Sequence, residues 1–546
     1  MPSSPIVGLP ARTSFRLLAA LVVLIAGCSF PPTGGSRPEA RSGAPRGGSF
    51  VRANPSDGAT MNPLLASDSY SRGYAEMVYS APLLRMNPET TAWDAKEGAA
   101  ESFTLSPDGL RLTYRLKPGL VWSDGRPITS ADYLFTFEKM RDPAVDYPYR
   151  ANLTSIASAR APDERTIEFT FREPFCPAID YTNINPVPKH IFENLDINDN
   201  PENQKPTVGS GPWLLKEWIK DDRASFVANE RFYLGRPNLD TYTIRIVRNS
   251  QVAYSLLKTG EVDQASIRPD DWAEAASLGN ITPIQYYPAG SSWTYIGFNL
   301  RSSLVSDLRV RQAFAMAVPR QQLVDRVRLG HARLINSIYA PSSWAYDPTT
   351  PAVDFDPERA RRLLDQAGWR TPDGNPGGVR QKDGREMRLR IFYNASNRDA
   401  EQIAVVTQAA LRQVGAELEV IGEELSAFLN RTNRTHDVEM WVNTWISPIE
   451  PHSRFNAWKS EDNATGFADP VVDALFMKAA TLSGCQNADR GQVYAEVQRR
   501  IAAEAPYIFL WEIELLYGVN SRIVTNPVTG LGFFYREWEW YSKTGK

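Results

Sequence analysis

A short aromatic run followed directly by an amphipathic helix, within residues 293–320, constrains the fold of this chain more than any other stretch. The run WTYIGFN contains Trp293 and Tyr295 and has the apolar character of a buried strand. Asp307 then stands where its carboxylate can accept from the free N–H groups of a helix start. Pro319 ends the apolar helical pattern. This order of elements predicts an α/β protein.

The length and charge of the chain narrow its class further. A chain of 546 residues is too long for one core, so we expect two or more lobes. The formal net charge is −3, and no basic patch interleaved with aromatic residues is present. This pattern argues against a nucleic-acid partner. The four histidines share no metal-ligand spacing, so the sequence predicts neither a metal site nor a cofactor.

The N-terminus has the layout of a secretory signal. Arg12 and Arg16 precede an apolar run that is too short to span a bilayer, and the run ends in Ile-Ala-Gly-Cys at Cys28. This ending resembles a bacterial lipobox, which implies a lipoprotein signal peptide over residues 1–27 and diacylation of Cys28. Two acyl chains would hold the protein on a membrane surface. The alternative is an ordinary signal peptide with a chance cysteine. Residues 28–48, rich in Pro, Gly, Ser and Arg, are expected to form a disordered tether.

The residues give no support for catalysis. The chain contains no Ser/His/Asp, Cys/His or P-loop motif, and no spacing of carboxylates picks out a general acid–base pair. Gly209-Ser210-Gly211 is not a nucleophile elbow, because Val208 stands where that motif needs glycine. We therefore expect no enzyme. A triad assembled only in space stays the alternative.

Two further cysteines, Cys176 and Cys485, lie far from any motif. An oxidising compartment would allow them to pair. Two separate buried thiols are the other interpretation, because the sequence does not give the distance between them.

Several motifs along the chain favour one family. Thr104 to Leu116 alternates as a hairpin around Pro107-Asp108-Gly109, and Lys258-Thr-Gly-Glu-Val-Asp263 ends a helix and starts a strand. Trp122-Ser-Asp-Gly125 leads into Pro127-Ile-Thr-Ser-Ala-Asp132, where Thr129 or Ser130 can cap a helix over 131–140. These motifs resemble segments of family 5 solute-binding proteins. The same resemblance extends to Pro188-Lys189-His190, Gly209 to Trp213, Asp356-Pro357-Glu358 and the run at 293–320. That family comprises the dipeptide, oligopeptide and nickel-type receptors of ABC importers.

The resemblance implies a fold and its boundaries. It implies an α/β, two-lobed periplasmic-binding-protein-like fold of type II, the large family 5 variant with an extra subdomain, built of mixed sheets flanked by helices. Lobe 1 would span residues 49–298, with the extra subdomain at about 80–200. Lobe 2 would span 299–509, and 510–546 would return to lobe 1. Lobes joined by extended crossings can close by hinge bending.

The resemblance places the ligand between the lobes on four stretches. The predicted ligand-binding residues are Asp68, Ser69 and Tyr70; Ser266 and Arg268; Trp293, Tyr295 and Asn299; and Trp441, Asn443, Trp445 and Ser447. Each could instead serve core or surface packing. Trp441 and Trp445 are four apart on a predicted strand and therefore share a face, which suits a packed core or a binding wall.

One departure from the family pattern bears on the ligand. Oligopeptide receptors of this family carry an Asp that pairs with the α-amino group of the peptide. That position here is Ser447, and no acid lies between Glu439 and Glu450. A free peptide N-terminus is therefore not an expected ligand feature. A modified peptide, an opine-like compound, a sugar or a metal chelate stay open, and Asp68 could supply a charge from the other lobe.

Taken together, these patterns predict a monomeric substrate-binding lipoprotein of an ABC importer. It would be anchored outside the cytoplasm, in the periplasm or at the cell surface. It would deliver a peptide or peptide-like solute to the transmembrane subunits of a permease. The alternatives are a receptor that presents its ligand to a membrane sensor and a secreted hydrolase.

Overall fold

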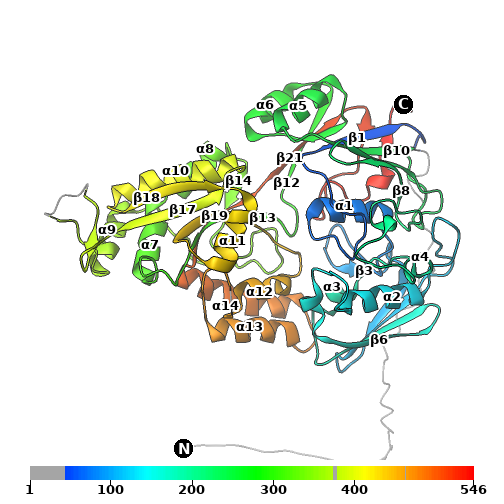
Figure 1. Ribbon diagram of the computed structural model, residues 1–546, viewed down its shortest axis with the longest axis horizontal. Helices are drawn as coiled ribbons and strands as arrows, with labels where there is room; N and C mark the ends of the chain where they lie inside the picture. Colours follow the sequence, from blue (N-terminus) through cyan, green and yellow to red (C-terminus); the bar gives the residue numbers. More distant parts are fainter. Residues whose placement is uncertain (1–43, 373–377, 462, 546) are drawn as a thin grey trace, which may run out of the picture. The chain divides into compact units, whose positions relative to one another are not determined.

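The computed structural model describes residues 44–372, 378–461 and 463–545 (Figure 1). The predicted signal peptide, Cys28 and residues 28–43 of the predicted tether lie outside this part of the chain. All described residues belong to one compact unit, Pro38–Lys546. Helices pack on mixed sheets throughout, as the α/β prediction requires.

The first lobe is built on a seven-stranded sheet. Its order is β12 (Ile281–Tyr286), β21 (Leu515–Asn520), β11 (Gln264–Ser266), β1 (Ser49–Asn54), β10 (Thr241–Ile246), β9 (Arg223–Ala228) and β8 (Trp213–Ile219). β1 pairs in parallel with β10 and β11, and the remaining pairs are antiparallel. The N-terminal strand is therefore central, and a C-terminal strand pairs beside β12.

A four-stranded antiparallel sheet adds a second layer to this lobe, in the order β4 (Ala100–Leu105), β5 (Arg111–Leu116), β7 (Thr166–Phe171), β6 (Ile156–Asp163). The helices of the lobe are α1 (Ser69–Val78), α2 (Ser130–Arg141), α3 (Ala178–Thr182), α4 (Lys189–Phe192), α5 (Ser250–Thr259) and α6 (Trp272–Ser277). Two short pairs complete it: β2 (Arg85–Met86) with β3 (Trp93–Asp94), and β22 (Ile523–Val524) with β23 (Tyr541–Ser542).

The second lobe is built on a six-stranded sheet, in the order β14 (Ala332–Leu334), β20 (Tyr507–Ile513), β13 (Ser292–Phe298), β19 (Met440–Ile446), β17 (Arg388–Asn394), β18 (Glu417–Glu423). Its helices are α7 (Leu308–Ala317), α8 (Arg320–Val327), α9 (Pro357–Gln366), α10 (Arg398–Gln413), α11 (Leu425–Asn430), α12 (Phe455–Trp458), α13 (Pro470–Thr481) and α14 (Asn487–Glu504). A short pair, β15 (Gln381–Lys382) with β16 (Arg385–Glu386), lies between α9 and β17.

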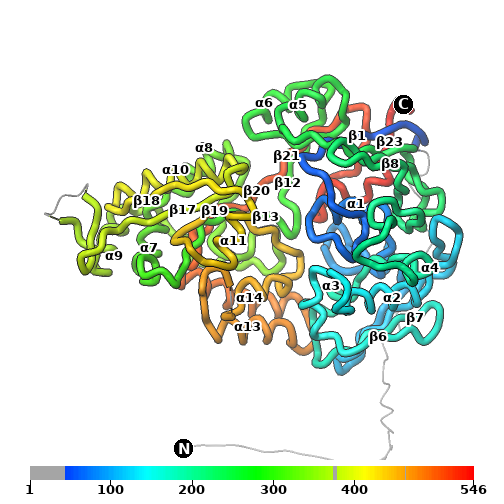
Figure 2. The backbone as a smooth tube through the Cα atoms, in the orientation of Figure 1, coloured from blue at the N-terminus to red at the C-terminus, as the bar shows by residue number. Residues whose placement is uncertain are grey.

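The chain crosses between the two lobes twice. It leaves β12 and enters β13 through residues 287–291, and it returns through Glu514 between β20 and β21. β12 and β21 pair along their whole length, so the two crossings start side by side (Figure 2). The predicted lobe boundaries at 298 and 509 fall at the end of β13 and within β20, both strands of the six-stranded sheet. These boundaries stay predictions.

β13 separates two cores of the second lobe. Alternation along the strand sends Ile296 and Phe298 to one face, where they join the core that includes α7, α8 and α10. Trp293 and Tyr295 point to the opposite face and join the core of α13 and α14. The crossing strand is therefore buried on both faces, which explains its continuous apolar and aromatic composition.

Several local predictions are confirmed. Asp307 caps α7 and accepts from the backbone N–H of Arg309 at 2.9 Å. Thr129 is the residue before α2, and its N–H donates to the Asp132 carboxylate at 2.8 Å. β4 and β5 form the predicted antiparallel hairpin. Gly260 ends α5 in the left-handed conformation, φ +80°, that glycine adopts without strain.

Gly297 offers a test of this packing. It stands opposite Trp441 in the β13–β19 register, and a Cβ added at Gly297 would lie 2.4 Å from Cε2 of the Trp441 ring. We expect Gly297→Ala to lower the free energy of unfolding by about 1–3 kcal/mol, because the ring cannot move away within a filled core. Urea denaturation measures the change.

The matched control is Gly279→Ala, since Gly279 is exposed and nothing lies within 4 Å of an added Cβ. Equal unfolding midpoints for the two variants would contradict the close approach of Trp441 to β13.

Candidate ligand-binding site

The six-stranded sheet brings aromatic residues from three strands onto one face. β13 runs antiparallel to β19 and β20, and the register sets Trp293 opposite Trp445 and Tyr295 opposite Asn443 and Phe509. We call the resulting group the aromatic face; it comprises Trp293, Tyr295, Trp441, Trp445, Tyr507 and Phe509. The six rings extend along β13 from Trp293 and Trp445, beside the segment through which the chain enters the second lobe, to Trp441 and Tyr507 at the far end of the strand.

Tyr295 is the centre of the aromatic face. Its ring stacks on Tyr507, with centroids 4.1 Å apart, and lies nearly parallel to Trp445 at 6.2 Å and 11°. Five of the six rings are buried, whereas Trp445 is half-buried. Trp445 is therefore the ring by which this face reaches solvent. Burial raises the pKa of Tyr295 well above its usual value, so its hydroxyl stays protonated.

The three indole N–H groups of the face differ in their partners. Trp293 Nε1 donates to Ser447 Oγ at 2.8 Å, and Trp441 Nε1 donates to the Tyr295 hydroxyl at 3.4 Å. Trp445 Nε1 is buried; it interacts with the Tyr507 hydroxyl but does not meet the distance and angle of a good hydrogen bond. A poorly paired buried donor is uncommon in folded proteins. A bound molecule could supply it with a better acceptor.

Arg454 was not predicted from the sequence, although it contacts this face. Its guanidinium carbon lies 5.0 Å from the centre of the Trp445 ring, within the range of a cation–π contact. Arg454 directly precedes α12 and ends a short 3-10 helix, Pro451–Arg454, which is too short for a periodic pattern to indicate the direction of its side chains. Tyr507 was likewise missed, because it is one apolar residue in a continuous buried strand.

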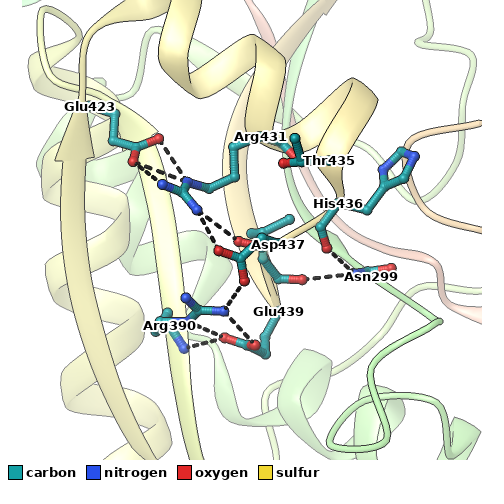
Figure 3. Close-up of polar contacts among 9 residues, drawn as sticks. Asn299, Arg390, Glu423, Arg431, Thr435, His436, Asp437 and Glu439 are labelled. Carbon is teal, nitrogen blue, oxygen red and sulfur yellow. Dashed lines mark hydrogen bonds and ion pairs between the residues drawn. The ribbon is translucent and has the colours of Figure 1, made fainter.

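The predicted residues Asn299 and Asn443 have local structural roles. Asn299 Nδ2 donates to the carbonyls of His436 and Val438 at 2.8 and 2.9 Å, as Figure 3 shows for the His436 contact. Its Oδ1 accepts from the N–H of Arg301. Asn443 Oδ1 accepts from the N–H of Thr444 at 2.8 Å. A ligand contact for either side chain stays a prediction.

An ionic network holds the edge of the same sheet (Figure 3). Arg390 of β17 pairs with Glu439 and Asp437, and Arg431 pairs with Glu423 of β18 and with Asp437. The network ties two neighbouring strands, β17 and β18, to the segment before β19. Glu439, the acid nearest to β19 on that side, is therefore committed to an arginine.

In the first lobe, Asp68, Ser69 and Tyr70 form the start of α1. Asp68 accepts from the N–H groups of Tyr70 and Ser71, both at 2.9 Å, and so acts as a helix cap. Partial burial favours the neutral acid, but the hydrogen bonds from Ser71 and Tyr70 outweigh it and lower the pKa of Asp68. Ser69 is exposed and Tyr70 half-buried. Their role toward a ligand stays a prediction.

Ser266 and Arg268 line a different cavity, of about 480 Å³. Its walls also include residues of α8 and α10 and the crossing residue Glu514, and Arg268 forms an ion pair with Asp270. α8 and α10 pack on the Ile296 and Phe298 side of the sheet, whereas the aromatic face packs on α13 and α14. The structure therefore does not bring these two residues together with the aromatic face.

Cys176 and Cys485 form a disulfide, with Cα atoms 5.1 Å apart. Cys176 follows β7 of the first lobe and Cys485 lies between α13 and α14 of the second, and the N–H of Cys176 donates to the carbonyl of Ala480. Nearby, Arg490 and Glu450 form a buried ion pair at 2.5 Å. The bond is thus a third covalent connection between the lobes, in addition to the two crossings.

The described residues include neither a metal-binding cluster nor a membrane-spanning helix. No group of three His, Cys, Asp or Glu side chains among them is arranged to hold a metal ion. Within the same ranges, none of the helices combines the length and apolar content that crossing a bilayer requires.

Two α/β lobes, joined by paired crossings and carrying an aromatic face beside them, define a two-lobed solute-binding protein. A family model for bacterial extracellular solute-binding proteins, family 5, matches residues 94–466. The chain therefore belongs to this family.

Individual relatives agree with this assignment. The oligopeptide-binding protein AppA of Bacillus subtilis is 27% identical over 522 residues, which cover 92% of this chain and 93% of AppA. The structure of that AppA with a nonapeptide has a TM-score of 0.78 at 24% identity, covering 91% of this chain and 99% of that chain. NikZ from Campylobacter jejuni in complex with Ni(L-His) has a TM-score of 0.79 at 24% identity, with the same coverage. These structural likenesses establish the fold.

The disulfide leads to a prediction about stability. We expect the double variant Cys176→Ser/Cys485→Ser to lose about 2–5 kcal/mol of unfolding free energy, because the bond closes a very long loop of the unfolded chain. Guanidinium denaturation of oxidised wild type, reduced wild type and the double variant measures this loss.

Reduced wild type serves as the control and should unfold like the double variant. Two free thiols in the oxidised protein, detected by mass after alkylation, would contradict the bond.

Proposed function

We propose that this protein is the substrate-binding lipoprotein of an ABC importer. It captures a peptide or peptide-like solute between its lobes and delivers that solute, unaltered, to the transmembrane subunits of a permease. The lipid anchor at Cys28 would keep it at the membrane surface, outside the cytoplasm. It acts as a monomer and needs no cofactor.

The observation that carries this proposal is the half-buried Trp445, stacked on Tyr295 at the rim of the aromatic face beside the guanidinium of Arg454. An apolar surface with a few unmatched polar groups is typical of sites that bind small molecules. It lies beside the crossings, where both lobes can contact one ligand. Family membership supports a receptor in place of an enzyme.

Closure of the lobes would couple binding to a change that a permease can recognise. A ligand that contacts both lobes only in the closed form shifts the population toward that form, in proportion to its differential affinity. The two crossings permit such a rotation, whereas the disulfide keeps Cys176 beside Cys485. We therefore propose a closure of limited amplitude.

The named relatives bind two classes of ligand. AppA of Bacillus subtilis was solved with a nonapeptide and NikZ with Ni(L-His). We favour the peptide-like class for this chain, because the aromatic face offers stacking surfaces. Modified peptides, opine-like compounds, sugars and metal chelates are the other candidates, and native mass spectrometry of the purified protein would identify a co-purified molecule among them.

Two other functions are distinguishable from transport. A receptor for a membrane sensor would bind the same ligand, but a deletion of the protein would leave ligand uptake by intact cells unchanged. A hydrolase would change the ligand chemically. Incubation of the protein with a mixed library of short peptides, followed by mass spectrometry of the free and bound fractions, separates binding from turnover.

Trp445 provides the direct test of this site. We expect Trp445→Ala to weaken the binding of library peptides about tenfold, because an aromatic contact contributes roughly 0.5–1.5 kcal/mol beyond its buried area. Calorimetric titration with a peptide selected from the library measures the change.

Trp218→Ala is the control, since Trp218 is half-buried in β8 of the first lobe and lies outside the aromatic face. Unchanged affinity in Trp445→Ala, or equal losses in both variants, would remove the aromatic face from the site.

A further inference from the structure

Arg454 is a partly buried cation without a partner. Its side chain makes no hydrogen bond or ion pair with the described residues, its Nε is buried, and its one contact of note is with the Trp445 ring. Leaving a buried donor unsatisfied is destabilising, because the group loses its hydrogen bonds to water and gains none from the protein. Exposed arginines such as Arg398 avoid this penalty because water solvates them. Within the described residues, the protein therefore supplies no acceptor to the Arg454 guanidinium.

Other buried arginines show what a satisfied guanidinium looks like in this chain. Arg311 donates to the carbonyls of Ser306 and Glu504 at 2.7 Å, and Arg320 donates to those of Val353 and Phe509. Arg490 pairs with Glu450. Arg52 also has an unpaired Nε, but the nearby Glu537 and Tyr242 raise its pKa even though burial acts to lower it.

Among the described residues, no carboxylate pairs with Arg454. The segment 440–449, which includes β19 and the turn after it, contains no Asp or Glu. The acids that flank it are both committed, Glu439 to Arg390 and Glu450 to Arg490. Burial lowers the pKa of Arg454, and so does Arg72 of the first lobe, while Tyr295 and Tyr149 raise it. None of these groups in the described part of the chain is an acid.

Arg72 supplies a second positive charge from α1 of the other lobe. Its Nη1 donates to the Tyr149 hydroxyl at 3.3 Å, and no ion pair is formed by Arg72 within the described residues. The Arg454 guanidinium beside the Trp445 ring is thus an unpaired donor group, and Arg72 adds positive charge to its surroundings. Such a group favours a ligand that carries acceptors and negative charge.

We propose that Arg454 and Trp445 form an anion subsite, which binds a carboxylate or phosphate group of the ligand while its adjoining part stacks on the indole. A guanidinium can hold either group through two parallel N–H donors. The subsite selects for an anionic ligand and against one that is only cationic. This inference rests on the proposed capture of a peptide-like solute and specifies its charge.

The test uses two libraries of short peptides with the same internal sequences. One is N-acetylated with a free C-terminal carboxylate, and the other has a free amino group with an amidated C-terminus. Each library is equilibrated with the oxidised wild-type protein, and bound members are counted by native mass spectrometry. We expect wild type to retain the acetylated acids at least tenfold better.

Variants then assign the preference to Arg454. Arg454→Met should lower retention of the acetylated acids about 10- to 100-fold, the usual loss for a hydrogen bond to a charged group. Arg454→Lys keeps the positive charge but loses the two parallel N–H donors of the guanidinium, so it should recover part of the lost retention. Arg398→Met is the matched control, because it removes one exposed, unpaired arginine and should leave retention unchanged. Circular dichroism verifies that each variant is folded.

The possible results are distinct. Equal retention of both libraries by wild type, or retention by Arg454→Met as strong as by wild type, overturns the anion subsite and leaves peptide capture standing. Retention of neither library overturns the capture itself. Displacement of the acetylated acids by inorganic phosphate shows that phosphate shares the subsite. Retention of the acetylated acids in the presence of phosphate assigns the subsite to carboxylates. Displacement and retention both support an anion as the group that the subsite recognises.

Discussion

The antiparallel pairing of β13 with β19 on one side and β20 on the other is the constraint on which the rest of the second lobe depends. This pairing determines which side chains of β19 and β20 lie beside Tyr295. It leaves room for the Trp441 ring only because residue 297 is a glycine and has no Cβ. A slip of one residue would send Trp293 and Tyr295 to the opposite core. The aromatic face is thus a property of register as much as of composition.

Charge around this face is distributed unequally. The acids at both ends of β19 are held by arginines, Glu439 at the sheet edge and Glu450 in the core of α14. These pairs stabilise the scaffold and at the same time remove negative charge from the face. What is left there is a set of donors, in Arg454 and Trp445. The same ion pairs that hold the sheet therefore set the polarity of the surface it presents.

Local elements were predictable from the sequence because their signals are short-range. The strand and helix of 293–320, the cap at Asp307 and the hairpin of β4 and β5 each follow from residues a few positions apart. The resemblance to a family also pointed to the aromatic residues of β13 and β19, which the structure places on one face; their contact with a ligand stays a prediction. The sequence could not show that Ser266 and Arg268 border another cavity, because that depends on which face of the sheet each helix covers.

Other features depend on contacts between segments far apart in the chain. Cys176 and Cys485 pair because the segment after β7 packs against α13 and α14. No periodic pattern in the sequence predicts that packing. The amide of Asn299 was predicted to face the ligand, yet it holds the loop before β19 through two carbonyls. Arg454 is the last residue of a short 3-10 helix, Pro451–Arg454, which is too short for a periodic pattern to show where its side chains point. That Arg454 has no paired acid among the described residues depends on ion pairs formed by segments far apart in the chain.

In the proposed hinge closure, the disulfide and the unmatched guanidinium would both favour the closed form. A third covalent link removes widely separated arrangements of the lobes, so an open state would have less conformational entropy to lose on closing. An unsatisfied Arg454 raises the free energy of any ligand-free state in which it is buried, by about 1–3 kcal/mol. A ligand anion held by Arg454 would also be attracted by Arg72 of the first lobe, so that contact would be stronger in the closed form. Because a shift from mostly open to mostly closed needs about 5.5 kcal/mol of differential affinity, each contribution lowers what the remaining contacts must provide.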